Sequence, residues 1–215
     1  MPKVGMQDLR RRQLIEATVR TIEAHGFADA TIARISQRAG LSSGIISHYF
    51  GGKNALLEAT MRSLLTELQR ETIARLRQAR TPIARIEAIL GASFAEAQFT
   101  PQVSSVWLSF YAQVQHSPEL ARLHRVYVQR LRSNLRDAFG QLLSPETAER
   151  AAEGMSSMID GIWVRAALAQ EPPDLRRAHG LADDYLRMAL QYYAARERAG
   201  YGDHRAGATG TRNGD

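Results

Sequence analysis

Cysteine is missing from this chain of 215 residues. Its absence excludes disulfide bonds and thiolate metal ligands, and it fits a protein of the reducing cytoplasm, where we expect this chain to act. No apolar run approaches the ~18 residues of a membrane-spanning helix, and the N-terminus lacks the apolar stretch of a secretory leader, so we expect neither. The six histidines form no pair at the spacing of metal ligands. We therefore expect no metal and no other cofactor.

Basic residues outnumber acidic ones, 28 against 22, which gives a net charge of +6. Residues 1–53 hold eight Lys and Arg against four Asp and Glu, so most of the excess lies in the first quarter of the chain. This distribution favours a polyanionic partner, although Arg-rich surfaces are often simply solvated. Arg10, Arg11 and Arg12 stand at the start of a predicted helix at 8–25, after an arm at 1–7. They are candidates either for DNA phosphate contact or for a solvated first turn.

Residues 31–50 have the pattern of two short helices joined by a tight corner. Thr31 is placed to cap the first helix, and apolar side chains then recur at helical spacing. Gly40 supplies the backbone freedom for the turn, and Ser42 is placed to cap the second helix. Because nucleating so short a helix is unfavourable, neighbouring elements must hold it. The pattern predicts a helix-turn-helix with its recognition helix at 42–50.

The predicted recognition helix has one inward apolar stripe, Ile46 and Phe50, while its other side is small and polar. Such a side lets the backbone approach the major groove of double-stranded DNA. His48 also has the alternative of an ordinary surface histidine. We expect Ser43, Gly44, Ser47 and His48 to meet base edges, Thr31, Tyr49 and Lys53 to meet phosphates, and Ser42 to lie with them at the DNA.

Downstream, the apolar spacing predicts helices and nowhere the two-residue alternation of a strand. A long helix is predicted from Asn54 to about Arg77, and it is the natural lever between the DNA-binding part and the rest. Four hydroxyl–proline pairs then mark helix starts, each with an N-cap residue before proline at the first helical position: Thr81-Pro82, Thr100-Pro101, Ser117-Pro118 and Ser144-Pro145.

These starts predict helices near 82–98, 101–115, 118–142 and 145–169, and Pro172-Pro173-Asp174 starts a final helix to about Arg198. The fold class is therefore all-α, with about nine helices. We divide the chain into a helix-turn-helix DNA-binding domain at 1–53, a helical regulatory and dimerisation domain at 54–199, and a disordered tail at 200–215.

Two short motifs resemble a hydrolase elbow and a phosphate-binding loop, but the residues around them do not fit either site. Residues 40–44 match G-x-S-x-G, the nucleophile elbow of hydrolases, but that motif needs a preceding strand, and a helical pattern precedes it here. Gly51-Gly52-Lys53 lacks the Ser or Thr and the earlier glycine of a phosphate-binding loop, so it is better explained as a turn. We expect no enzyme, since no paired carboxylates, metal spacing or nucleophile–base set is present.

The sequence also resembles a known family. Residues 40–62, GLSSGIISHYFGGKNALLEATMR, are similar to the signature of TetR-type repressors. Together with MPKVGMQ and RRQLIEAT near the start and MIDGIWVR at 158–165, they resemble the choline-responsive BetI repressors. This resemblance implies a homodimer that binds a palindromic operator. It also implies that operator binding is lost or altered when a small ligand enters the C-terminal domain.

The ligand site is harder to find from the pattern. Trp107 and Tyr111 share one side of a predicted helix, and Asp160 and Trp163 share a face of a later one. Aromatic faces with a nearby carboxylate suit a quaternary ammonium such as choline, although aromatic stripes are more often plain core. Our hypothesis is that some of these four residues line the pocket.

Dimerisation is expected through the last two helices. A stripe of small residues, Gly154, Ser157 and Gly161, would let another helix approach closely, and two subunits could form a four-helix bundle. Packing within one subunit is the alternative. The preferred function is a repressor of choline transport and of glycine betaine synthesis from choline. A TetR-type repressor that answers another cationic or lipophilic ligand, and an all-α enzyme or scaffold, are the alternatives.

Overall fold

The computed structural model describes residues 3–169 and 171–199 and gives side-chain surroundings from residue 6 onward. Within those ranges the chain forms nine helices and no strand, which confirms the all-α prediction. They are α1 (Lys3–Asp29), α2 (Ile32–Ala39), α3 (Ser43–Phe50), α4 (Lys53–Gln78), α5 (Pro82–Ser93), α6 (Pro101–Val114), α7 (Pro118–Phe139), α8 (Pro145–Leu168) and α9 (Leu175–Arg198). The tail predicted at 200–215 lies outside the described residues.

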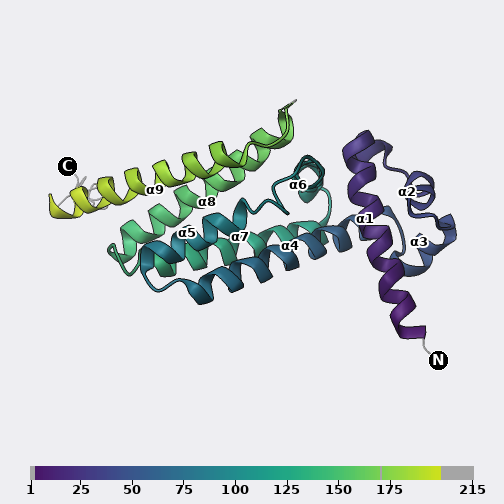
Figure 1. Ribbon diagram of the computed structural model, residues 1–215, viewed down its shortest axis with the longest axis horizontal. Helices are drawn as coiled ribbons and strands as arrows, with labels where there is room; N and C mark the ends of the chain where they lie inside the picture. The colour runs from purple at the N-terminus through teal and green to yellow at the C-terminus, as the bar shows by residue number, and fades with distance from the viewer. Residues whose placement is uncertain (1–2, 170, 200–215) are drawn as a thin grey trace, which may run out of the picture.

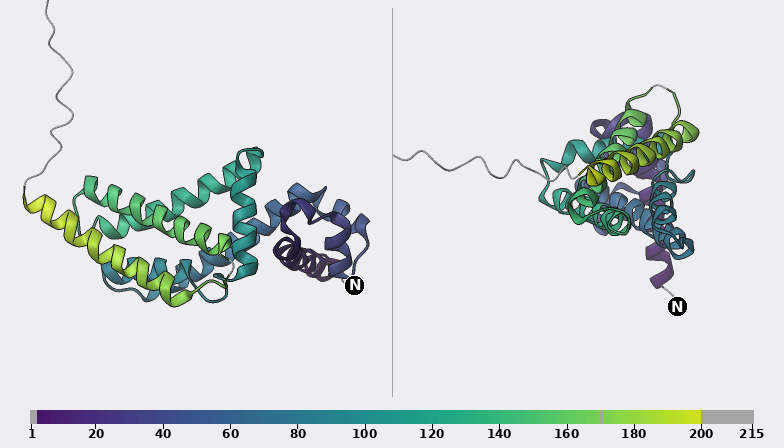
Figure 2. Two further views of the ribbon diagram at one scale, coloured as in Figure 1. Left: turned by 90° about the horizontal axis from the view of Figure 1, so that it is seen from above. Right: turned by 90° about the vertical axis from the view of Figure 1, so that its left-hand side faces the viewer.

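Helices α1 to α3 form a head at one end of an elongated molecule, and α4 leads from it into a bundle with α5, α7, α8 and α9 (Figure 1). Helix α6 crosses between the head and the bundle and packs along α1. The view from above shows the same separation, with α9 on the outside of the bundle (Figure 2, left). The head is therefore joined to the bundle through α4 and through the α1–α6 contact.

Local caps explain where most helices begin. The hydroxyls of Thr81, Thr100 and Ser117 each accept a hydrogen bond from the backbone N–H three residues later, with proline at the first helical position. Ser144 makes no such cap bond. Its backbone N–H donates instead to Glu197 Oε1 at 2.8 Å, so it ties the start of α8 to the end of α9.

Two helices end earlier than the sequence pattern predicts. Helix α5 stops at Ser93 rather than near 98, because the turn after it directs Phe94 and Phe99 into the core. Their rings meet edge to face at 5.4 Å between centroids. Helix α7 likewise stops at Phe139, where the chain turns and buries Leu143. In both cases the burial of apolar side chains in the turn outweighs the helical pattern.

The N-terminal helix begins at Lys3, which corrects the prediction of an arm at 1–7 and a start near Asp8. Gly26 interrupts it with φ 71° and ψ 167°, a conformation that glycine adopts without steric cost, and a short turn continues to Asp29. Leu14 and Ile22 of this helix are fully buried. The helix therefore packs against α2, whereas α3 packs against α2 and α4.

Candidate DNA interface and ligand site

Helix α3 is held by its apolar stripe and exposes its small polar side. Ile46 is fully buried, and Phe50 is half-buried against the same core. Gly40 before the helix and Gly51 after it both have left-handed φ, 64° and 80°, which sets both tight turns. The polar residues predicted to meet DNA are exposed, namely Ser42, Ser43, Gly44, Ser47 and His48.

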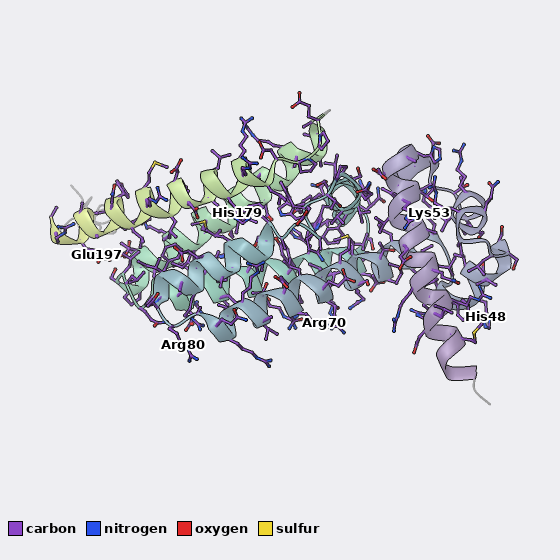
Figure 3. All side chains as sticks on the ribbon, in the orientation of Figure 1. His48, Lys53, Arg70, Arg80, His179 and Glu197 are labelled. Atoms are coloured by element: carbon purple, nitrogen blue, oxygen red, sulfur yellow. The ribbon has the colours of Figure 1, made fainter. Side chains whose placement is uncertain are left out.

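Gly44 leaves the backbone of α3 open. A Cβ built at this position meets no atom within 4 Å. No packing inside the protein therefore requires glycine here, although a duplex close to the helix would. His48 and Tyr49 lie next to one another with ring centroids 5.1 Å apart, and Figure 3 labels His48 at the outer edge of the head.

Thr31 and Ser42 occupy the two N-cap positions but behave differently. Thr31 Oγ1 accepts from the backbone N–H of Arg34 at 3.3 Å. Ser42 makes no side-chain cap bond. Its hydroxyl is thus available at the exposed N-terminus of the recognition helix, where backbone N–H groups and the helix dipole favour an anion.

Lys53 does more within the head than the sequence predicts. Its ammonium donates to the backbone carbonyls of Phe27 and, at 2.9 Å, Ala28, and it lies 4.3 Å from the centroid of the Phe27 ring. Burial lowers the pKa of Lys53, and the nearby Asp29 carboxylate opposes that change. Two of its three N–H groups hold the end of α1, so one remains for a phosphate. Figure 3 shows the residue in the head.

Arg11 plays the corresponding role at the end of α3. Its guanidinium donates to the Tyr49 carbonyl at 2.7 Å and lies 4.4 Å from the centroid of the Phe50 ring. A cation at a helix C-terminus satisfies a carbonyl and complements the helix dipole. The sequence suggested for Arg11 either a phosphate contact or a solvated first turn, because a partner 38 residues away leaves no local signal.

A basic depression of about 450 Å³ lies between α1 and α2, lined in part by His25, Arg34, Gln37 and Arg38. The last three are exposed on α2. The first helix of a helix-turn-helix crosses the DNA backbone, so these side chains are further phosphate candidates. The sequence signal for them is the positive charge of Arg34 and Arg38 on the first helix of the helix-turn-helix.

The four predicted ligand residues meet in the bundle, and a fifth joins them. Asp160 Oδ1 accepts from the hydroxyls of Tyr111, at 3.1 Å, and Tyr127, at 3.2 Å. The Trp107 ring lies 5.7 Å from Tyr111, 5.0 Å from Tyr127 and 5.8 Å from Trp163 between centroids. We call these five residues the aromatic–carboxylate cluster.

Burial dominates the electrostatics of this cluster. It raises the pKa of Asp160, although the Tyr111 and Tyr127 hydroxyls and the nearby His124 act in the opposite direction. It also raises the pKa of both tyrosines, and the Asp160 carboxylate reinforces that shift. Both hydroxyls therefore stay protonated and donate to a carboxylate that water reaches poorly.

The tryptophans form the rigid part of the cluster. Trp107 and Trp163 are only 4% and 5% exposed, and Trp163 Nε1 donates to the Ser93 carbonyl at 3.2 Å. At the observed spacing the rings contact one another, so a trimethylammonium group enters only if a ring moves aside. Tyr111 and Tyr127 are both partly exposed, and Tyr127 also lines a cleft between α4, α5 and α7.

Neither a metal-binding cluster nor a membrane-spanning helix is found in the ranges that the structure describes. There, no three His, Asp or Glu side chains are arranged to hold a metal ion. No helix among the same residues is long and apolar enough to cross a bilayer.

The chain is similar to known regulators over nearly its whole length. Residues 14–60 match the family described as bacterial regulatory proteins, tetR family, and residues 82–191 match the BetI-type transcriptional repressor, C-terminal family. The HTH-type transcriptional regulator BetI of Brucella suis (strain ATCC 23445 / NCTC 10510) is 47% identical over 190 residues, covering 88% of this chain and 96% of the relative. That of Burkholderia mallei (strain NCTC 10229) is 46% identical over 191 residues, 88% and 98% of the two chains.

Solved structures share the fold. A transcriptional regulator from Pseudomonas aeruginosa PAO1 superposes with a TM-score of 0.73 at 27% identity, covering 89% of this chain and 94% of its own. A regulator from Saccharomonospora viridis in complex with choline gives a TM-score of 0.70 at 19% identity, covering 82% and 95%. These relatives are transcriptional regulators and not enzymes. The chain belongs to the TetR family of DNA-binding transcriptional regulators, with a BetI-type C-terminal domain.

Proposed function

We propose that this protein represses the genes of choline transport and of glycine betaine synthesis from choline, and that choline changes its affinity for the operator. The observation that carries the choline assignment is one partly buried carboxylate, Asp160, which joins a cluster of four aromatic rings. Aromatic faces attract a quaternary ammonium by ~0.5–2 kcal/mol per contact. The BetI relatives support the same class of effector, while the choline-bound fold neighbour is too distant to supply more than the fold.

The DNA step in this proposal uses the exposed side of α3. Ser43, Gly44, Ser47 and His48 meet base edges in the major groove, and Thr31, Ser42, Tyr49 and the remaining N–H of Lys53 meet phosphates. The exposure of the small polar residues and the open space at Gly44 support this assignment. In this proposal residues 1–53 bind DNA, and residues 54–199 bind the ligand and form the dimer.

The ligand step begins at the aromatic–carboxylate cluster. In the structure, Asp160 accepts hydrogen bonds from the hydroxyls of Tyr111 and Tyr127. A trimethylammonium group takes the place of the Tyr127 ring beside Trp107 and brings a positive charge to Asp160. The carboxylate thereby exchanges a neutral donor for a cation in a poorly solvated site, where the attraction between opposite charges is strong. Choline meets this requirement with a compact head and a single hydroxyl.

Two elements connect the cluster to the head. Helix α6 carries Trp107 and Tyr111 and packs along α1, where Gln102 Nε2 donates to Glu23 Oε1 at 2.7 Å. Helix α4 runs directly from the recognition helix into the bundle. A ligand that shifts α6 changes the placement of the head on α4. A coupling of ~1–3 kcal/mol suffices for a 5–150-fold change in operator affinity.

The proposed homodimer uses the outer face of α8 and α9. Large apolar side chains are exposed there, including Leu181, Met188 and Tyr192 at 49%, 60% and 59%. A Cβ at Gly161 would meet nothing within 4 Å, which leaves α8 open to a partner helix, whereas Gly154 is filled by Tyr185 of its own chain. Pairing these faces across a two-fold axis gives a four-helix bundle and two heads for a palindromic operator.

A mobility-shift titration with the DNA upstream of the protein's own gene tests the proposal. We expect a specific complex with two protomers on one site, and choline but not ethanolamine should weaken or alter it. Unchanged binding in saturating choline would contradict the effector, and equal binding to a shuffled sequence would contradict the repressor.

A further inference from the structure

One buried hydroxyl on helix α6 is left without a partner. Ser104 is 1% exposed, and within the part of the chain that the structure describes its Oγ has no hydrogen-bond partner. Buried polar groups are nearly always hydrogen-bonded, so one that is not requires an explanation. The contacts of the proposed choline site with Trp107, Tyr127 and Asp160 leave this hydroxyl unused.

The neighbouring serines show that α6 could satisfy such a hydroxyl by itself. Ser105 Oγ donates to the Pro101 carbonyl at 3.0 Å, and Ser109 Oγ donates to the Ser105 carbonyl at 2.8 Å, each four residues back. The equivalent acceptor for Ser104 is the Thr100 carbonyl, which accepts from the Ser104 backbone N–H at 2.9 Å but not from its hydroxyl. The hydroxyl is therefore available to a group outside its own helix.

Helical geometry places Ser104 on the face of α6 that carries the aromatic–carboxylate cluster. Trp107 and Tyr111 follow it by three and seven residues, and residues at those spacings share one face of a helix. Gln102 lies on another side, where it bonds Glu23 of α1. Because the Cβ atoms of residues three apart are ~5–6 Å from one another, Ser104 stands beside Trp107, one turn nearer the start of the helix.

The other hydrogen-bonding groups of the cluster are already engaged. The two tyrosine hydroxyls donate to the carboxylate, and Trp163 Nε1 donates to the Ser93 carbonyl. Two more buried side-chain atoms lack a partner in the described ranges, Ser36 Oγ and Arg85 Nε, but they belong to α2 and α5, which carry no residue of the cluster. Ser104 is therefore the unpaired hydroxyl that a ligand in the cluster can reach.

We propose that Ser104 binds the hydroxyl of choline and so makes the site select an alcohol over a plain quaternary ammonium. This inference rests on the proposed choline site, because it assigns the second end of the same ligand. The trimethylammonium group lies between Trp107 and Asp160, and the ligand hydroxyl, two carbons away, bonds Ser104 Oγ. A serine hydroxyl can donate one hydrogen bond and accept two, so the pair forms in either direction. Without this partner, the ligand hydroxyl would lose its bonds to water on entering the site.

The stability of the ligand-free protein separates a ligand contact from a packing role. Ser104→Ala removes an unpaired buried hydroxyl and introduces the best helix-forming residue, so the variant should melt at the same temperature as the wild type or higher. A serine that holds the fold together would give the opposite result. A lowered melting temperature would therefore contradict the assignment.

Calorimetry on the full chain with choline and ethyltrimethylammonium, which differ only in the hydroxyl, tests the selectivity. We expect the wild type to prefer choline, and Ser104→Ala to reduce that preference by about tenfold or more, through weaker choline binding. Ser105→Ala is the matched control, because it removes the next hydroxyl along the helix, which is bonded to its own backbone. It should leave the preference unchanged.

The outcomes also separate this inference from the proposed function. Equal binding of the two ligands by the wild type, an unchanged preference in Ser104→Ala, or an equal effect of Ser105→Ala would overturn the role of Ser104 while the choline site stands. If the wild type binds neither ligand, the choline site itself is wrong, and the inference falls with it.

Discussion

Gly44 gives the sharpest test of how α3 meets DNA. Because a Cβ at this position has nothing within 4 Å, Gly44→Ala fits the free protein without a clash. Replacing an exposed helical glycine by alanine should raise the free energy of unfolding, by up to ~1 kcal/mol. On operator DNA the added methyl group meets the groove floor, and such overpacking costs ~1–3 kcal/mol. At 1.4 kcal/mol per factor of ten, that cost corresponds to roughly a 5–150-fold loss of affinity.

The assay is fluorescence anisotropy with operator DNA, beside a thermal melt of the same preparation. Gly180→Ala is the matched control, since Gly180 is an exposed glycine of α9 that is equally open and lies outside the head. It should stabilise the protein and leave DNA affinity unchanged. If Gly44→Ala bound operator as tightly as the wild type, the α3 backbone would not approach the bases.

Further outcomes follow from the contacts of single residues. Lys53→Ala should lower the melting temperature, because Lys53 holds the end of α1 through Phe27, and should reduce the salt-dependence slope of DNA binding by about one, whereas an unchanged slope would remove its phosphate contact. Choline should bind more weakly as the pH falls through the raised pKa of Asp160, since the protonated acid loses its charge, and calorimetry should find Asp160→Asn at least tenfold weaker and insensitive to pH in that range. Met188→Glu should place a charge in the proposed dimer face and give monomers in sedimentation, so a stable dimer would contradict that face.

Features set by neighbours in sequence could be predicted from the chain alone. The hydroxyl–proline pairs located the starts of four helices, because an N-cap and the first turn are local. The corner of the helix-turn-helix followed from Gly40 for the same reason. The end of α5 could not be found this way, since it depends on Phe94 and Phe99 packing into a core that distant helices complete.

In the aromatic–carboxylate cluster, too, local spacing was predictable and contacts between distant helices were not. Trp107 and Tyr111, like Asp160 and Trp163, were paired by helical spacing, but their meeting depends on how α6 packs on α8. Tyr127 was missed because valines flank it in the sequence and no Phe, Trp, Tyr, Asp or Glu stands three or four residues away, so its partner is found only across the bundle. The internal roles of Lys53 and Arg11 were missed for the same reason, since each bonds a carbonyl more than twenty residues away.

The absence of cysteine allows a direct test of whether α3 lies in the major groove. The single substitution Ser47→Cys places one thiol on the exposed side of the helix, where it can carry an iron chelate that cleaves nearby DNA. We predict two clusters of cuts in the major groove of the operator, ~34–36 Å apart or a multiple of that spacing. Cuts in the minor groove, or a pattern no different from that of a chelate at Gly180→Cys, would contradict the proposed DNA interface.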